Sequence, residues 1–196
     1  MLTRQIQRGV TLVEIVITLA ILSLLLGLAY PSYTAWLTNL QIRSATEKML
    51  SGLQLARAEA MKSNTTVRFS LVDNMTNACA LLDTGSIAIV SRSNPAGKCD
   101  IGASDTVEPF ISQILAMQEG SARVNVTATD GAGNARTNVV FNGLGRVLTA
   151  TDWIRQIDFD VPPANANRAL RLQISASGQI RMCDPAVVST TDTRKC

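Results

Sequence analysis

The feature that most constrains this chain is an apolar run near its N-terminus. At 1.5 Å of rise per residue, a helix over its 21 residues spans roughly 30 Å, about the thickness of the hydrocarbon core of a bilayer. The run therefore predicts a membrane-spanning helix that anchors whatever follows. It extends from Val10 to Tyr30 and is interrupted only by Thr11, Glu14, Thr18, Ser23 and Gly27.

The residues before this run, 1–9, are polar and basic. Arg4 and Arg8 predict that this end stays in the cytoplasm, because basic residues flank membrane helices on that side. A secretory signal peptide also has a basic start and an apolar stretch. This run is long for such a peptide, and no convincing small-residue cleavage site follows it before Pro31. A retained anchor is therefore the better interpretation.

Glu14 is the anomaly of the run. A carboxylate inside an apolar helix costs on the order of 2.5–3.5 kcal/mol on insertion scales, so it needs a partner. The apolar segment contains no lysine or arginine. Either Glu14 lies near the interface and reaches headgroups or water, or it pairs with a positive charge that arises only after processing or assembly.

The segment Arg8-Gly9-Val10-Thr11-Leu12-Val13-Glu14 resembles the class III signal of type IV pilins and pseudopilins. The resemblance implies that prepilin peptidase cuts between Gly9 and Val10 and methylates the new amine of Val10. It also implies that Glu14 pairs with such an amine, in its own or a neighbouring subunit. Pro31 matches the proline that kinks the long helix of this family. Val10 departs from the usual phenylalanine, which puts the efficiency of processing in doubt.

This resemblance gives the chain an expected organisation. Residues 1–9 form a leader that is removed, 10–30 a helix for the membrane and the filament core, and 31–62 an amphipathic continuation. Residues 63–196 form a β-rich head. The N-terminus is expected in the cytoplasm and the head in the periplasm, with the chain leaving the inner membrane for a filament. The implied partners are other major and minor pilins or pseudopilins, which the helix contacts.

Beyond Pro31 the helical pattern continues to about Lys62. A first apolar stripe, Tyr33, Trp36, Leu37 and Leu40, is expected to extend the filament contact. A second stripe recurs at intervals of three and four, which defines one face of a helix. It consists of Ile42, Ala45, Met49, Leu53, Ala56 and Ala60, and we expect it to pack on a sheet.

The remainder changes to short runs rich in Val, Ile, Thr and Phe, separated by Gly, Asn, Asp and Pro, as strands are by turns. Alternation in several runs predicts antiparallel sheets with one face in water. The fold class is therefore α+β, type IV pilin-like: a long N-terminal helix packed on a mainly antiparallel head. The expected strands are Thr66–Val72, Ala80–Leu82, Ile87–Val90, Val124–Thr129, Thr137–Phe141, Ile157–Val161 and Leu170–Ser175.

Three shorter segments complete this prediction. Turns are expected at 130–134 and at Asn142-Gly143, and an exposed loop at 94–105. The stretch from Phe110 to Gln118 fits either a short helix or a strand.

Four cysteines suit an exported head, and they allow three pairings. We favour Cys79 with Cys99 and Cys183 with Cys196, because each pair closes a local loop of moderate size and contributes roughly 3 kcal/mol. The second pair also ties down a polar C-terminal tail. Zinc is the alternative, but the spacing lacks a C-x-x-C pair and no histidine helps. We therefore expect no metal and no cofactor.

Composition argues against several other functions. The chain contains no histidine, which removes the usual general base, and no nucleophile motif is present. We therefore expect no enzyme. The net charge of +3 is too small to imply nucleic acid by itself.

Within the pilin superfamily, the head resembles the FimU-like GspH/FimT family of minor pilins and pseudopilins. The residues that carry this resemblance are 141–146, Phe-Asn-Gly-Leu-Gly-Arg, and 177–183, Ser-Gly-Gln-Ile-Arg-Met-Cys. Such proteins serve type IV pili or type II secretion. The C-terminal cysteine loop favours a minor pilin in the tip or assembly-priming complex, with pseudopilin H of a secretion system as the alternative. The presence of Glu14 favours an internal position, because the capping subunit usually lacks this acid.

A third alternative is a minor pilin that binds DNA for uptake. Some relatives carry a basic G-R-x-R segment near the C-terminus. Here the stretch is Gly178-Gln179-Ile180-Arg181, which lacks one arginine. A solvated sheet face with scattered charges explains the same residues. The candidate phosphate-binding residues are Arg168, Arg171, Arg181, Arg194 and Lys195, opposed by Asp184 and Asp192.

Overall fold

The computed structural model of the chain describes residues 11–117, 123–149, 152–162 and 168–196. It divides into two compact units, Met1–Leu37 and Thr38–Cys196. One helix, α1 (Leu12–Ser63), contributes to both units. The expected leader and the cleavage site between Gly9 and Val10 lie outside the described residues.

In the first unit, α1 starts directly after Thr11, and its apolar composition continues without a charged residue after Glu14. Pro31 lies inside the helix, although proline removes a main-chain hydrogen bond and usually kinks a helix. Over the described residues, no single helix meets the length and hydropathy required for a membrane span. The segments Leu12–Leu28 and Tyr30–Ser63 meet them only as a bent pair, by length and composition.

The described residues of the second unit form eight strands in two four-stranded sheets. The first sheet has the order β3-β2-β1-β5 and the second the order β4-β6-β7-β8, and the neighbouring strands in both sheets are antiparallel. The predicted α+β class with antiparallel sheets is therefore confirmed. The strands are β1 (Val67–Val72), β2 (Ile87–Ser91), β3 (Ile111–Ala116), β4 (Asn125–Thr129), β5 (Asn138–Phe141), β6 (Gln156–Asp160), β7 (Leu170–Ile174) and β8 (Ile180–Cys183).

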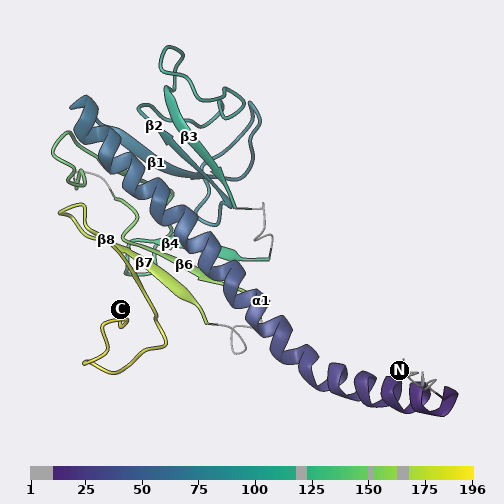
Figure 1. The fold of residues 1–196 in the computed structure, drawn as a ribbon. Coiled ribbons are helices and arrows are strands. Elements are labelled where there is room, and N and C mark those ends of the chain that lie inside the picture. Colours follow the sequence, from purple (N-terminus) through teal and green to yellow (C-terminus); the bar gives the residue numbers. More distant parts are fainter. Residues whose placement is uncertain (1–10, 118–122, 150–151, 163–167) are drawn as a thin grey trace, which may run out of the picture. The chain divides into compact units, whose positions relative to one another are not determined.

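The main core lies between the second half of α1 and both sheets. In Figure 1 this part of the helix runs across the two sheets, with β1–β3 on one side of it and β6–β8 on the other. Phe69 and Phe141 from the first sheet and Phe159 from the second are fully buried in one cluster with the helix. The predicted second stripe is confirmed, since all six of its residues are 0% exposed: Ile42, Ala45, Met49, Leu53, Ala56 and Ala60.

A second, smaller cluster covers the opposite face of the first sheet. It joins Ile87 and Ile89 of β2 to Ile111 of β3, and it includes the buried cysteines Cys79 and Cys99. Side chains alternate along β2, so Ala88 and Val90 enter the main core instead. β2 is therefore buried on both faces, and the two connections on either side of it, residues 73–86 and 92–110, supply the outer cover with Cys79 and Cys99.

One predicted strand needs correction, and the structure decides three other points. Ala80–Leu82 is not a strand, because only Leu81 forms an isolated bridge, with Val72. Of the two alternatives for the stretch from Phe110 to Gln118, the strand is correct, since it contains β3. β8 was not predicted as a strand. The turn at 130–134 is confirmed by the hydrogen bond from Asp130 N to the Asn134 carbonyl oxygen.

Candidate assembly and interaction sites

Thr11 caps the first turn of α1. Its Oγ1 atom accepts a hydrogen bond from Glu14 N at 3.2 Å, and its carbonyl oxygen accepts one from Ile15 N at 3.2 Å. A threonine followed three residues later by a glutamate is the sequence signature of a capping box. This role was not predicted, although the spacing Thr11-x-x-Glu14 indicates it.

The cap places Glu14 in the first helical turn. The unpaired N–H groups there carry a partial positive charge, which stabilises a nearby carboxylate by about 0.3–1 kcal/mol at exposed sites. This gain is smaller than the cost of a carboxylate in lipid. The helix terminus therefore offsets only part of the cost, and Glu14 still needs a full positive charge if it enters an apolar environment.

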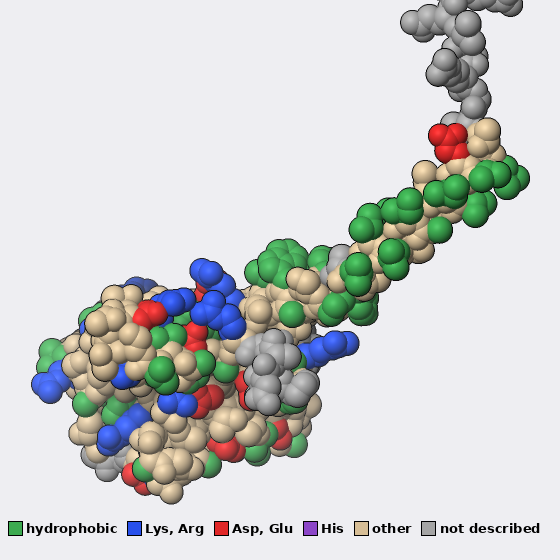
Figure 2. Space-filling view, turned by 90° about the horizontal axis from the view of Figure 1, so that it is seen from below, with side chains coloured by type: hydrophobic (Ala, Val, Ile, Leu, Met, Phe, Trp, Pro, Cys, Tyr) green, Lys and Arg blue, Asp and Glu red, His purple; other side chains and the backbone are tan. Residues whose placement is uncertain are grey.

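The apolar side chains of the first unit are exposed. Their exposed fractions between Leu12 and Leu28 run from 49% at Ile15 to 77% at Leu12. Figure 2 shows hydrophobic side chains along the visible face of this helical segment. Folded monomers in water rarely expose so large a continuous apolar surface, which marks a site for lipid or for other proteins.

The first predicted stripe continues this surface. Tyr33 and Trp36 are 57% and 56% exposed, and their ring centroids lie 6.0 Å apart. Leu37 and Leu40 are 37% and 44% exposed. This stripe does not contribute to the core of the second unit, unlike the stripe that begins at Ile42. The two predicted stripes therefore differ in burial: the first is exposed and the second is buried.

Both favoured cysteine pairings are present as disulfides. Cys79 and Cys99 are joined across a sequence separation of 20, and Cys183 and Cys196 across a separation of 13. The second disulfide closes the C-terminal loop directly after β8. Within this loop Asp184 N donates to the Arg194 carbonyl oxygen at 2.7 Å, so the tail is fixed by main-chain contacts as well.

The predicted basic residues lie at this end of the second sheet, but most of them are paired with acids. Arg171 contacts Asp158 across β7 and β6, with Nη2–Oδ2 at 3.1 Å. Figure 2 shows basic and acidic side chains interspersed on the visible face of the head. The other ion pairs are Arg168 with Asp184 at 2.9 Å and Arg194 with Asp192 at 2.7 Å.

The pairs involving Arg168 and Arg194 also stabilise the C-terminal loop. Asp184 is 5% exposed and needs the positive charge of Arg168. The main-chain N–H of Arg168 donates to Asn39 Oδ1 of α1 at 2.9 Å, so this residue joins the helix to the loop. Hydrogen bonds from Arg194 lower the pKa of Asp192 to about 2. DNA binding by these residues stays a prediction, and their ion pairs reduce the charge available for it.

The two segments that carry the family resemblance lie against each other. The Gly145 carbonyl oxygen accepts a hydrogen bond from Arg57 Nε of α1 at 3.0 Å, and Gly178 touches the same carbonyl group. Val147 N also donates to the Ala176 carbonyl oxygen at 3.1 Å. These segments therefore form a junction between the helix and the two sheets, and Arg57 is a residue of this junction that the sequence analysis did not identify.

No group of three or more His, Cys, Asp or Glu side chains is placed to hold a metal ion among the described residues. The cysteines that could have bound zinc are used in disulfides. The features that remain are an exposed apolar helix, a capped acidic first turn, and a head closed by two disulfides.

Comparison with known families agrees with these features. Residues 45–178 match the family model described as type II transport protein GspH. The chain belongs to this GspH family. Residues 4–30 match the prokaryotic N-terminal methylation motif. The predicted identity as a type IV pilin-like protein of the minor pilin and pseudopilin class is therefore confirmed.

Two crystal structures of the type IV minor pilin FimU from Pseudomonas aeruginosa are similar to this GspH-family chain. In one crystal form the identity is 14%, with a TM-score of 0.46, over 75% of this chain and 99% of FimU. In the other the identity is 15%, with the same TM-score, over 76% of this chain and 95% of FimU. No curated protein matches the chain.

Proposed function

We propose that this chain is a minor subunit of a type IV filament, inserted through its N-terminal helix after removal of residues 1–9 by prepilin peptidase. The observation that carries the proposal is the exposed apolar surface from Leu12 to Leu28, with the carboxylate of Glu14 in its first helical turn. In a membrane or in the core of a filament this surface is buried. Its function is therefore structural, and no reaction is assigned to it.

The proposed processing explains Glu14. Cleavage after Gly9 creates an α-amine at Val10 that is cationic at neutral pH. A carboxylate and an amine that leave water together cost far less than an unpaired carboxylate, because each charge compensates the other. Pairing Glu14 with the amine of a neighbouring subunit fixes the register between adjacent helices. The charge pair therefore links processing to assembly.

We assign the subunit to a pilus, at an internal position in the tip or assembly-priming complex. The disulfide between Cys183 and Cys196 supports a pilus, since it protects the tail of a head that leaves the cell. Glu14 supports an internal position, where a helix has a neighbour to pair with. Shearing should therefore release the protein from the cell surface together with the major pilin.

A pseudopilus of a type II secretion system is the second candidate. The description of the matching family model, type II transport protein, favours it. Deletion of the chain separates the two candidates. Loss of surface filaments with normal secretion of exoproteins supports the pilus, and the opposite pattern supports the pseudopilus.

The direct test of the proposal is the mature N-terminus. The intact mass and N-terminal sequence are measured on protein from membranes with and without prepilin peptidase. A chain that begins at methylated Val10 only when the peptidase is present supports the proposal. An uncut chain from Met1, or one cut beyond Pro31, contradicts it and leaves a membrane-anchored or secreted β-domain.

A further inference from the structure

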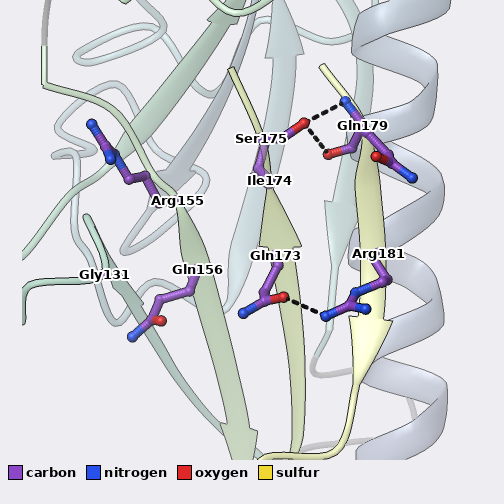
Figure 3. A pocket seen from close by; sticks show the side chains of 8 residues that line it. All are labelled: Gly131, Arg155, Gln156, Gln173, Ile174, Ser175, Gln179 and Arg181. Carbon is purple, nitrogen blue, oxygen red and sulfur yellow. Dashed lines mark hydrogen bonds between the residues drawn. The ribbon is translucent and has the colours of Figure 1, made fainter. Parts of the chain in front are cut away.

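A polar hollow of 540 Å³ lies on the second sheet, at one end of β6, β7 and β8. Figure 3 shows its lining, with Gln156 on β6, Gln173 on β7 and Arg181 on β8 side by side. Six polar side chains surround the hollow: Arg155, Gln156, Gln173, Ser175, Gln179 and Arg181. Among them, only Arg181 was predicted as a site residue.

The described lining contains two arginines and no carboxylate. Arg155 is held over the ring of Trp153, with Cζ 5.1 Å from the ring centroid, and forms no ion pair with a described residue. Arg181 donates to the Gln173 side chain at 3.0 Å and to the Lys195 carbonyl oxygen at 3.1 Å, both neutral acceptors. The hollow therefore carries two positive charges that the described part of the chain leaves uncompensated.

The carboxylates around the hollow already have arginine partners. Asp158, two residues along β6 from Gln156, is bound by Arg171. Asp130, next to Gly131 in the lining, is bound by Arg136, which also contacts Asp152. Arg155 also lines a neighbouring hollow with Asp130 and Asp152, but it forms no ion pair with a described residue. A carboxylate that pairs with Arg155 and Arg181 would therefore come from another molecule.

The glutamine side chains of the lining place neutral hydrogen-bonding groups beside the two arginines. Gln156 and Gln179 form no described side-chain hydrogen bond, so each offers one carbonyl acceptor and two N–H donors. A polypeptide main chain presents both N–H and C=O groups and satisfies both kinds. A nucleic-acid backbone presents phosphate acceptors, which leave the glutamine oxygens unpaired, and its extended charge would meet Asp158 and Asp160 on the same strand.

We infer that this hollow binds an acidic polypeptide segment of a neighbouring filament subunit. A carboxylate of that segment lies against Arg155 and Arg181, and its main chain bonds to the glutamine side chains. Charge-assisted contacts of this kind give a head-to-head interface its specificity and orientation. The identity of the partner as a filament subunit rests on the proposed function.

The experiment uses the full-length chain in cells that assemble the filament. A photo-crosslinking amino acid replaces Gln156, and the crosslinked peptide is identified by mass spectrometry from sheared filaments. A matched probe at Thr127, exposed on β4 of the same sheet, reports the background. The probe at Gln156 is then combined with one of three sets of substitutions. The double glutamate variant carries Arg155→Glu and Arg181→Glu, and the double lysine variant carries Arg155→Lys and Arg181→Lys. The third variant carries Arg123→Glu, because Arg123 is exposed and lies outside the hollow.

We expect the Gln156 probe to capture a segment of another subunit that contains Asp or Glu. The double glutamate variant should lower this product about tenfold or more, as expected for loss of about 1.4 kcal/mol or more of charge pairing. The double lysine variant and Arg123→Glu should retain it. Replacing the captured acid with arginine should restore the product of the double glutamate variant, which a merely misfolded head would not allow.

Three results overturn the inference: a chain present in filaments without a product at Gln156, a product that survives charge reversal, or a product with nucleic acid or glycan. The amount of chain in the filaments is measured separately. A chain absent from the filaments contradicts the proposed function and this inference with it. A chain present without an arginine-dependent product contradicts this inference alone.

Discussion

Gly178 lies so close to Gly145 that a Cβ atom at residue 178 would overlap the Gly145 carbonyl oxygen. Gly178 also has φ +80°, a conformation that L side chains rarely adopt. The Gly145 carbonyl oxygen is the acceptor for Arg57 of α1. This contact between two turns therefore lies where the helix and both sheets meet.

Gly178→Ala should destabilise the head strongly. Overpacking costs about 1–3 kcal/mol and the left-handed conformation about 1–2 kcal/mol more. The free energy of unfolding, measured by urea denaturation of residues 38–196, checks this. Gly133→Ala is the matched control, because Gly133 has φ +97° with no neighbour within 4 Å of a Cβ. Equal losses in the two variants would contradict the role assigned to the contact.

The two disulfides should protect different parts of the head. Each contributes about 2–4 kcal/mol by restricting the unfolded chain. Replacing Cys79 and Cys99 with serine should speed hydrogen exchange in the connections on either side of β2, residues 73–86 and 92–110, because these cysteines lie within the second core cluster. Replacing Cys183 and Cys196 should speed exchange only after β8. The same exchange pattern in both variants would show that this division of the head is wrong.

Asp130 should stabilise the head in a pH-dependent way. Hydrogen bonds from the Asn134 side chain and from nearby main-chain N–H groups, together with the charge of Arg136, lower its pKa from 3.8 to about 2. Since the folded-state pKa is the lower one, the contribution is complete above about pH 4 and is lost as the pH falls through 2.

Asp130→Asn should therefore be less stable than wild type at pH 7, and the difference should shrink below pH 4. Denaturation curves recorded between pH 7 and pH 2 check the sign. Asp100→Asn, an exposed substitution, reports how the rest of the head responds to acid. A difference that grows as the pH falls would contradict the assignment.

DNA binding should be weak at best. The ion pairs of Arg168, Arg171 and Arg194 leave little net positive charge for phosphate contacts. We expect little retardation of duplex DNA by residues 38–196 at about 0.15 M salt, where the Debye length is about 8 Å. Tight, salt-dependent retardation that is lost in the Arg168/Arg171/Arg181 triple alanine variant would show that these pairs open and that the DNA-binding alternative is correct.

Local patterns predicted much of this fold. The stripe from Ile42 to Ala60 was predictable because its period of three and four is a property of the helix itself. The two cysteine pairings were favoured because short loops close easily. Ala80–Leu82 was mistaken for a strand because composition alone does not show whether a neighbour is available to pair with it.

Features that depend on distant segments were not predictable. No local sequence pattern shows that Arg168 pairs with Asp184. Likewise, no local pattern shows that Gln156, Gln173 and Arg181 line one hollow, because the order of strands in the sheet brings these residues together. The contact of Gly178 with Gly145 has the same origin. The individual basic residues could be named from the sequence, but their ion pairs could not be predicted. These ion pairs determine how much uncompensated positive charge is left to bind a ligand.

The central claim is that Glu14 acts in assembly through its charge. Glu14→Ala and Glu14→Gln should both lower incorporation, since each removes the carboxylate that pairs with an α-amine. Thr18→Ala is the matched control in the same helix, because the Thr18 hydroxyl donates to the Ile15 carbonyl oxygen of its own turn and needs no outside partner.

The deciding measurement is the amount of each variant in sheared filament fractions, relative to its amount in membranes, with both head disulfides verified as intact. The account predicts that the two Glu14 variants are depleted from filaments while Thr18→Ala and wild type are incorporated equally. Equal incorporation of the Glu14 variants and wild type would contradict it.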